Sequence, residues 1–165
     1  LKRLDASLIG GGGKIGQVVS VTKADTFSTT SSSFTDITGL TVNITPVATS
    51  SKILVMFNCS LGNSTDGRVS IALMRASSYI SVGDAASSRI RASGFFYDYD
   101  SDTPGHIASN AGTFLDSPSS TSEQTYKMRI LTSGGTAVVN KSSTDSDSSQ
   151  GARTASTITV MEVLA

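Results

Sequence analysis

Apolar and polar residues alternate with a period of two along most of this chain, which is the pattern of a β-strand with one buried face. Turn-forming pairs such as Asp66-Gly67 and Pro104-Gly105 separate the alternating segments, and residues 27–38 are interpreted as a connection. Strands are predicted at Ile15–Val21, Leu40–Ile44, Ile53–Phe57, Val69–Leu73, Arg89–Phe96, Ile107–Leu115, Tyr126–Leu131, Ala137–Val139 and Thr157–Val163. Strands of this length predict an all-β fold, an antiparallel, jelly-roll-like β-sandwich of about eight to ten strands.

Two of these strands carry further information. Every residue of Ile53–Phe57 is apolar, so we expect both faces of this strand to be covered, one by the sandwich interior and one by a subunit interface. The strand Thr157–Val163 is expected to lie clamped inside a sheet. Its removal is expected to unfold the domain by taking the following residues from the core: Ile158, Val160, Met161 and Val163.

The chain divides into a short arm and one domain. Leucines near the start have helical spacing, but this segment is too short for a stable helix and ends at Gly10–Gly13. We therefore predict an N-terminal arm and Gly-rich linker at residues 1–14 and a β-sandwich domain at residues 15–165. Because the first residue is Leu1, we expect a processed product or part of a longer protein.

Composition narrows the classes of partner. Charged residues make up 16% of the chain, against about 25% in typical soluble domains. The formal net charge is zero and Lys and Arg do not cluster in the sequence, which argues against nucleic-acid binding and against membrane insertion. Cys59 is the single cysteine, so no intrachain disulfide forms, and its strand context predicts a small core residue.

The densest cluster of aromatic and polar residues lies between residues 97 and 106. Tyrosine rings stack on the apolar face of a sugar, and carboxylates accept hydrogen bonds from its hydroxyls, so this segment is the candidate for contact with a host surface glycan. The alternative is an ordinary exposed loop. The candidate receptor-binding residues are Tyr97, Asp98, Tyr99, Asp100, Asp102 and His106.

Two sets of carboxylates raise the question of a calcium site. Asp98, Asp100 and Asp102 share one side of an extended segment, and Asp145 and Asp147 form a smaller set. Calcium prefers oxygen ligands of this kind, but neither set has the twelve-residue loop spacing with its Gly and terminal Glu. Solvated charge is the favoured interpretation, and no metal or cofactor is predicted.

Other patterns favour structural roles. His106 is the sole histidine and no Gly-x-Ser-x-Gly elbow is present, so we expect no enzymatic activity. Asn140 begins one of several glycosylation sequons, which we interpret as chance matches in a chain rich in Ser and Thr. Arg89 and Arg91 alternate along a predicted strand, where they would meet acidic groups of another subunit or face solvent.

Several segments occur in an order that is typical of a recurrent viral module. They are Gly16–Phe27, Ile44–Pro46, Ser51–Val55, Gly83–Ala92, Phe114–Pro118, Thr125–Lys127 and Arg153–Glu162. Together they cover about residues 14–165, and they resemble C-terminal domains of tail-fibre-like and other virion appendage proteins of marine and cyanobacterial tailed phages.

This resemblance implies a trimer-forming β-sandwich of the tumour-necrosis-factor or complement-C1q type on the virion surface. The function that it implies is that of a fibre or spike tip that binds the host cell surface, attached to another virion protein through the N-terminal arm. The alternative is a capsid head fibre or decoration protein with a purely structural role. The resemblance does not identify the receptor.

Overall fold

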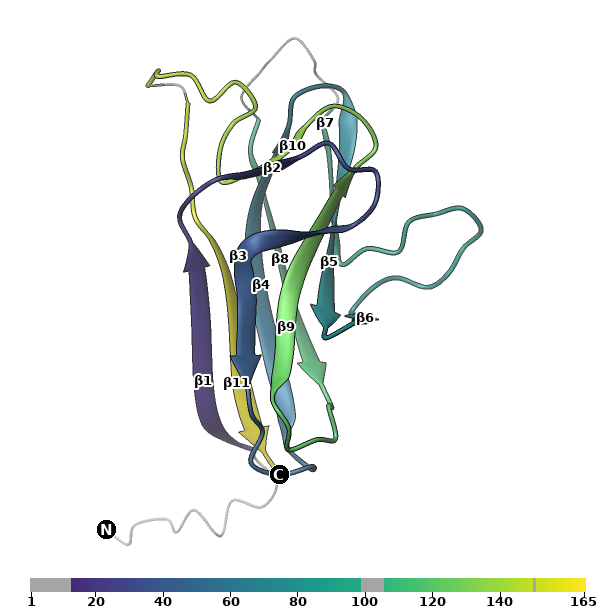
Figure 1. Ribbon diagram of the computed structural model, residues 1–165, viewed down its shortest axis with the longest axis vertical. Helices are drawn as coiled ribbons and strands as arrows, with labels where there is room; N and C mark the ends of the chain where they lie inside the picture. Colours follow the sequence, from purple (N-terminus) through teal and green to yellow (C-terminus); the bar gives the residue numbers. More distant parts are fainter. Residues whose placement is uncertain (1–12, 99–105, 150) are drawn as a thin grey trace, which may run out of the picture.

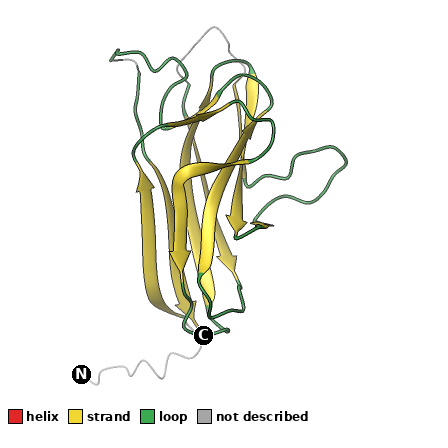
Figure 2. Ribbon diagram, in the orientation of Figure 1, coloured by secondary structure: helices red, strands yellow, loops and turns green. Residues whose placement is uncertain are grey.

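A computed structural model describes residues 13–98, 106–149 and 151–165, which fold into two antiparallel β-sheets packed face to face (Figures 1 and 2). These residues form eleven strands, three of which have only three residues, and no helix. The predicted all-β sandwich is therefore confirmed. The described residues contain no helix of the length and hydropathy needed to cross a membrane.

The first sheet has six strands in the order β1-β11-β4-β10-β2, and β8 pairs with the other edge of β4. Its strands are β1 (Lys14–Lys23), β2 (Phe27–Thr29), β4 (Lys52–Asn63), β8 (Ala108–Asp116), β10 (Ala137–Val139) and β11 (Ser156–Leu164). The second sheet has five strands in the order β3-β9-β5-β6, and β7 also pairs with β5. Its strands are β3 (Thr35–Ile44), β5 (Gly67–Arg75), β6 (Ser78–Ile80), β7 (Gly94–Asp98) and β9 (Gln124–Thr132).

The core lies between the two sheets, where alternate side chains of each long strand point inward. At the edges, β1 lies beside β3 and β7 lies beside β8, so the two sheets approach each other on both sides. The fully buried core residues include Ile37, Leu40, Ile53, Val55, Leu61, Val69, Ile71, Leu73, Met128, Ile130, Ile158 and Val160.

Strand β11 lies between β1 and β4 and pairs with both, which confirms that it is clamped inside a sheet. Ile158 and Val160 are fully buried, as expected. Met161 and Val163 were expected in the core as well, but they alternate with these residues and lie on the outer face of the sheet, where they are half-buried. The period of two forbids consecutive residues of a regular strand from facing the same side.

A β-bulge interrupts β1 between Ile15 and Val18. Because it adds one residue, both of these side chains lie on the outer face of the sheet. The bulge also directs the side-chain amide of Gln17 to the buried carboxylate of Glu162, with Nε2 2.9 Å from Oε2. Burial opposes ionisation of Glu162, but hydrogen bonds from the Val47 N–H, at 2.7 Å, and from Gln17 outweigh it and lower the pKa.

The predicted strand Arg89–Phe96 is only partly correct, because β7 begins at Gly94. Residues 81–93 leave the sheet as a loop, in which Ser81 and Ser87 have positive φ. The Arg91 Nε donates to the Gly83 carbonyl at 2.7 Å, so this side chain joins the two arms of the loop. Residues 89–92 therefore lie in the loop and form no strand, although apolar and polar residues alternate there.

The connection at residues 27–38 also contains strands that were not predicted. Phe27–Thr29 forms β2, and β3 begins at Thr35, five residues before the predicted start. Gly39, with φ of +87°, lies within an irregularity of β3 that interrupts the alternation. β10 is equally short but was predicted, because all three of its residues are apolar. β2 and β6 contain serine or threonine, and three residues are too few for a period to be recognised.

Cys59 lies fully buried on β4, which confirms its predicted core position. Burial raises the pKa of its thiol to about 12. At neutral pH the side chain is therefore an uncharged thiol that packs as a small apolar group.

Asn140, which is fully buried with φ of +64°, joins several strands at one end of the sandwich. Its Nδ2 donates to the carbonyls of Lys23 at 2.8 Å and Asp25 at 2.9 Å. Its Oδ1 accepts a hydrogen bond from the Ser156 hydroxyl at 2.6 Å, and that hydroxyl oxygen accepts the Ser60 N–H at 3.0 Å. The Asn140 side chain thus links the end of β1 to the start of β11 and to β4.

Candidate functional site

The predicted receptor-binding segment is divided between a strand and residues outside the described structure. Tyr97 and Asp98 were expected in a loop, but they are the last two residues of β7. Tyr99, Asp100 and Asp102 lie outside the described residues. Tyr97 is half-buried on the outer face of the second sheet, opposite Arg68.

Asp98 is buried, and its Oδ1 lies 3.1 Å from Nδ1 of the half-exposed His106. This pair joins the end of β7 to the residues before β8, at the end of the sandwich opposite the start of β1 (Figure 1). Asp98 is thus engaged within the domain, and the exposed acceptor expected from the sequence is not available at this position.

In the second acidic set, Asp145 is engaged within the domain, whereas Asp147 is exposed. Asp145 forms a bidentate ion pair with Arg153, at 2.6 and 2.8 Å, and lies 3.5 Å from the Lys141 amine. The hydrogen bond from Arg153 is the main cause that lowers the pKa of Asp145. Within the described ranges, no group of three or more His, Cys, Asp or Glu side chains is placed to hold a metal ion.

The outer face of the first sheet carries a continuous row of apolar side chains. Register places Val18 beside Met161, Met161 beside Leu54, and Leu54 beside Leu115, across strands β1, β11, β4 and β8. These four residues are called the apolar row below. Val18 and Leu115 are 55% and 46% exposed, so the row faces solvent in the single chain.

The neighbours of the apolar row extend it and carry little charge. Ile15 and Val163 pair on one side of it, and Met56 lies on the other side. Thr159 pairs with Met56, and its hydroxyl shares a hydrogen bond of 2.7 Å with the hydroxyl of Ser20 on β1. An apolar surface with few charges is typical of a face that another protein surface covers.

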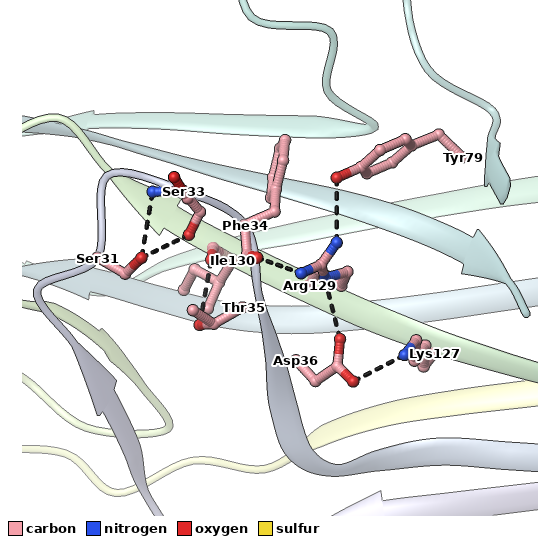
Figure 3. A network of polar contacts seen from close by, with 9 residues as sticks. All are labelled: Ser31, Ser33, Phe34, Thr35, Asp36, Tyr79, Lys127, Arg129 and Ile130. Atoms are coloured by element: carbon pink, nitrogen blue, oxygen red, sulfur yellow. Dashed lines mark hydrogen bonds and ion pairs between the residues drawn. The ribbon is translucent and has the colours of Figure 1, made fainter. Parts of the chain in front are cut away.

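The outer face of the second sheet is charged. Asp36 of β3 lies 2.7 Å from the Lys127 amine and 2.9 Å from Nε of Arg129 on β9 (Figure 3). Arg129 also donates to the Tyr79 hydroxyl at 3.1 Å and to the Phe34 carbonyl. The Tyr79 and Phe34 rings pack at 5.6 Å between centroids, so the network joins β3 and β9 to β6.

A groove of about 560 Å³ lies between the outer face of the second sheet and the loop at residues 81–93. Its floor includes the buried Ser70 and Leu131. Its rim consists of exposed side chains from β5, β7 and the loop, and of Ser133, the residue that follows β9. We call it the arginine groove, and its lining residues are Arg68, Ser70, Ser88, Arg89, Ile90, Phe95, Leu131 and Ser133.

Neither the apolar row nor the arginine groove was predicted from the sequence. The uninterrupted apolar run at residues 53–57 signalled that β4 has a second apolar face, but the partners on β1, β8 and β11 follow only from the register. Arg89 was singled out on the assumption of a strand, and Arg68 was not singled out at all. The two arginines come together because the loop passes near β5.

No family model matches the sequence, and a comparison with curated proteins gives no match. Among solved structures, the chain is similar to the VP2 subviral particle of infectious bursal disease virus, with 14% identity and a TM-score of 0.44, over 99% of this chain and 45% of that chain. The structure of the Gx strain of the same virus gives 14% identity and 0.44, over 99% and 46%. The chain spans less than half the length of each of these proteins.

Proposed function

We propose that this domain is a structural protein of a phage virion, a trimeric fibre or spike tip module that binds the host cell surface. The observation that carries the proposal is the apolar row on the outer face of the first sheet. Together with the order of segments that resembles phage appendage proteins, it supports a role in assembly and binding and not in catalysis.

The apolar row is suited to contact with further copies of the same chain. Each Val, Leu or Met side chain that is fully removed from water contributes on the order of 1.5 to 3 kcal/mol. Closed symmetry buries one such surface on every copy, which leaves no apolar face exposed at the end of assembly. Three copies around one axis are the arrangement that the resemblance favours.

We predict that the wild-type protein has a mass about three times the 17.0 kDa of one chain at micromolar concentration. Changing Val18 and Leu115 together to Lys should give a monomer, because two charges would then be desolvated in the interface. Both side chains are about half exposed in the single chain, so the substitutions should leave its fold intact. Multi-angle light scattering measures the mass.

The matched control for assembly is Ile90→Lys. Ile90 is 52% exposed, which is close to the exposed fractions of Val18 and Leu115. It lies, however, on the loop beside the second sheet. This variant should remain trimeric. A wild-type protein of single-chain mass, or a double variant that stays a folded trimer, would contradict the proposed interface.

Host binding is assigned to the end of the sandwich opposite the start of β1 (Figure 1). We predict that changing Tyr97 and Tyr99 together to Ala weakens adsorption of the particle to its host cells. Loss of the rings removes the surfaces on which a sugar would stack. Adsorption and the melting temperature are measured on the same variant, with Tyr79→Ala as the control because Tyr79 is an exposed tyrosine on β6.

Three outcomes of this experiment are informative. Reduced adsorption by a folded double variant, with normal adsorption by the Tyr79 variant, supports the receptor-binding role. Unchanged adsorption by a folded, trimeric double variant contradicts it and favours a structural role on the capsid. Loss of the cooperative melt would show that the half-buried Tyr97 belongs to the packed structure, and the receptor site would then have to lie elsewhere.

A further inference from the structure

We propose that the arginine groove binds a carboxylate-bearing saccharide, such as a uronic acid residue of a surface polysaccharide. The inference rests on the proposed host-surface role for its biological setting, and it assigns a ligand class to a place that the receptor-binding prediction did not include. It stands on three features of the groove, which are its arginines, its aromatic rim and its hydroxyls.

The two arginines of the groove differ from the other arginines of the described residues. Arg75, Arg129 and Arg153 each form an ion pair with an aspartate. Arg91 donates to a loop carbonyl. The guanidinium groups of Arg68 and Arg89, by contrast, form no ion pair or hydrogen bond with the described part of the chain, and both side chains are exposed at the groove.

A guanidinium group recognises a carboxylate well because its planar N–H groups match the two oxygens of the acid. Arg68 comes from β5 and Arg89 from the loop, so they approach the groove from different elements. The Arg68 backbone is fixed by Ser133, whose N–H donates to the Arg68 carbonyl at 2.9 Å and whose Oγ accepts the Arg68 N–H at 3.1 Å. One arginine is thus held on a rigid strand.

The remaining lining favours a sugar over a simple anion. Phe95 is 55% exposed on the outer face of β7, directly opposite Ser70, and it presents an aromatic ring to the groove. Aromatic rings pack against the apolar face of a sugar ring, while serine hydroxyls both donate to and accept from its hydroxyl groups. Such hydroxyls are supplied by Ser70, Ser88 and Ser133.

The size and charge of the groove agree with a short stretch of acidic saccharide. A volume of about 560 Å³ lies within the usual range of about 300 to 1,000 Å³ for small-molecule sites. Nucleic acid is disfavoured because the chain has no net charge and the lining offers only Arg68 and Arg89 as cations. The ligand is therefore defined by a carboxylate on a sugar ring.

The test measures binding of a hexagalacturonate to the purified protein by isothermal titration calorimetry. The matched probe is the same oligosaccharide with its carboxylates methyl-esterified, which keeps the rings and removes the charge. We expect the acidic form to bind and the ester to bind at least about tenfold more weakly, because charge-assisted hydrogen bonds are lost. Raising the salt concentration should weaken binding of the acidic form, since exposed charges are screened.

Variants identify the site. Arg68→Gln and Arg89→Gln should each weaken binding of the acidic form by about tenfold or more. Phe95→Ala should weaken binding of both forms. Lys52→Gln is the charge-matched control, because Lys52 is exposed on the outer face of the opposite sheet, and it should bind as the wild type does.

The proposal is overturned if the wild type does not bind hexagalacturonate at millimolar concentration, or if the two arginine variants bind as tightly as the wild type. It is also overturned if sodium sulfate at matched ionic strength competes as well as the saccharide does, or if Lys52→Gln is as damaging as the arginine changes. Adsorption to host cells is measured in parallel. If the wild type adsorbs to host cells but does not bind the saccharide in the groove, this inference alone is refuted. If the wild type does not bind host cells at all, the proposed function is refuted.

Discussion

A protein that lacks residues 157–165 should not fold cooperatively. These residues form most of β11, which separates β1 from β4 in the first sheet and pairs with both. Their removal takes Ile158 and Val160 from the core, each worth about 1.5 to 3 kcal/mol by burial alone. It also leaves β1 without its neighbour in the sheet. Together these losses amount to a large share of the free energy of unfolding of a typical domain, which is about 5 to 15 kcal/mol.

Thermal melting followed by circular dichroism tests this expectation, and a truncated protein that melts cooperatively as a trimer would show that β11 is peripheral. Point variants separate burial from sheet pairing. Ile158→Ala should cost about 2 to 5 kcal/mol, because it leaves a cavity between the sheets. Thr157→Ala, on the outer face one residue earlier, should cost about 0.5 kcal/mol or less. Deleting Ala165 alone, which is exposed, is the length control.

Asn140→Ala should lower the free energy of unfolding by about 3 to 5 kcal/mol, because two effects add. The substitution removes the buried side chain that hydrogen-bonds to the carbonyls of Lys23 and Asp25 and to the hydroxyl of Ser156. The backbone at this position has φ of +64°, which asparagine tolerates better than alanine. Chemical denaturation in urea measures the change.

Two further variants distinguish these causes. Asn140→Gly relieves the backbone cost but still loses the hydrogen bonds, so its stability should lie between those of the wild type and Asn140→Ala. Asn43→Ala removes an exposed amide that contacts Glu123 at 3.3 Å, and it should change stability by less than about 0.5 kcal/mol. If Asn140→Ala is no more damaging than Asn43→Ala, the buried hydrogen bonds at Asn140 are not important for stability.

The sequence predicted those strands whose two faces meet different surroundings. In β5 and β11 inward residues such as Ile71 and Ile158 are apolar and fully buried. In β1 the inward Val19 and Val21 are apolar and pack half-buried against the core. The alternation that follows from these positions is visible without a structure. The same logic failed for residues 89–92, because a short alternation also occurs in loops. It failed for Met161 because an apolar residue on the outer face resembles a core residue in the sequence.

The candidate sites were harder to predict because they depend on contacts between distant residues. Asn140 was noticed only as a sequon, although its partners lie on β1 and β11 and next to them. Arg68 and Arg89 are far apart in the sequence, and only the fold shows that they share a groove. Asp98 was assigned to a ligand, but its inward position at the end of β7 pairs it with His106.

The buried state of Cys59 makes this protein convenient for distance measurements with attached probes. Maleimide dyes and spin labels react with exposed thiolates, and the Cys59 thiol is neither exposed nor ionised at neutral pH. Since the chain has no other cysteine, a Ser88→Cys substitution would provide a single reactive position per copy, at the rim of the arginine groove. Energy transfer between labelled copies would then report how far apart the grooves lie on an assembled particle.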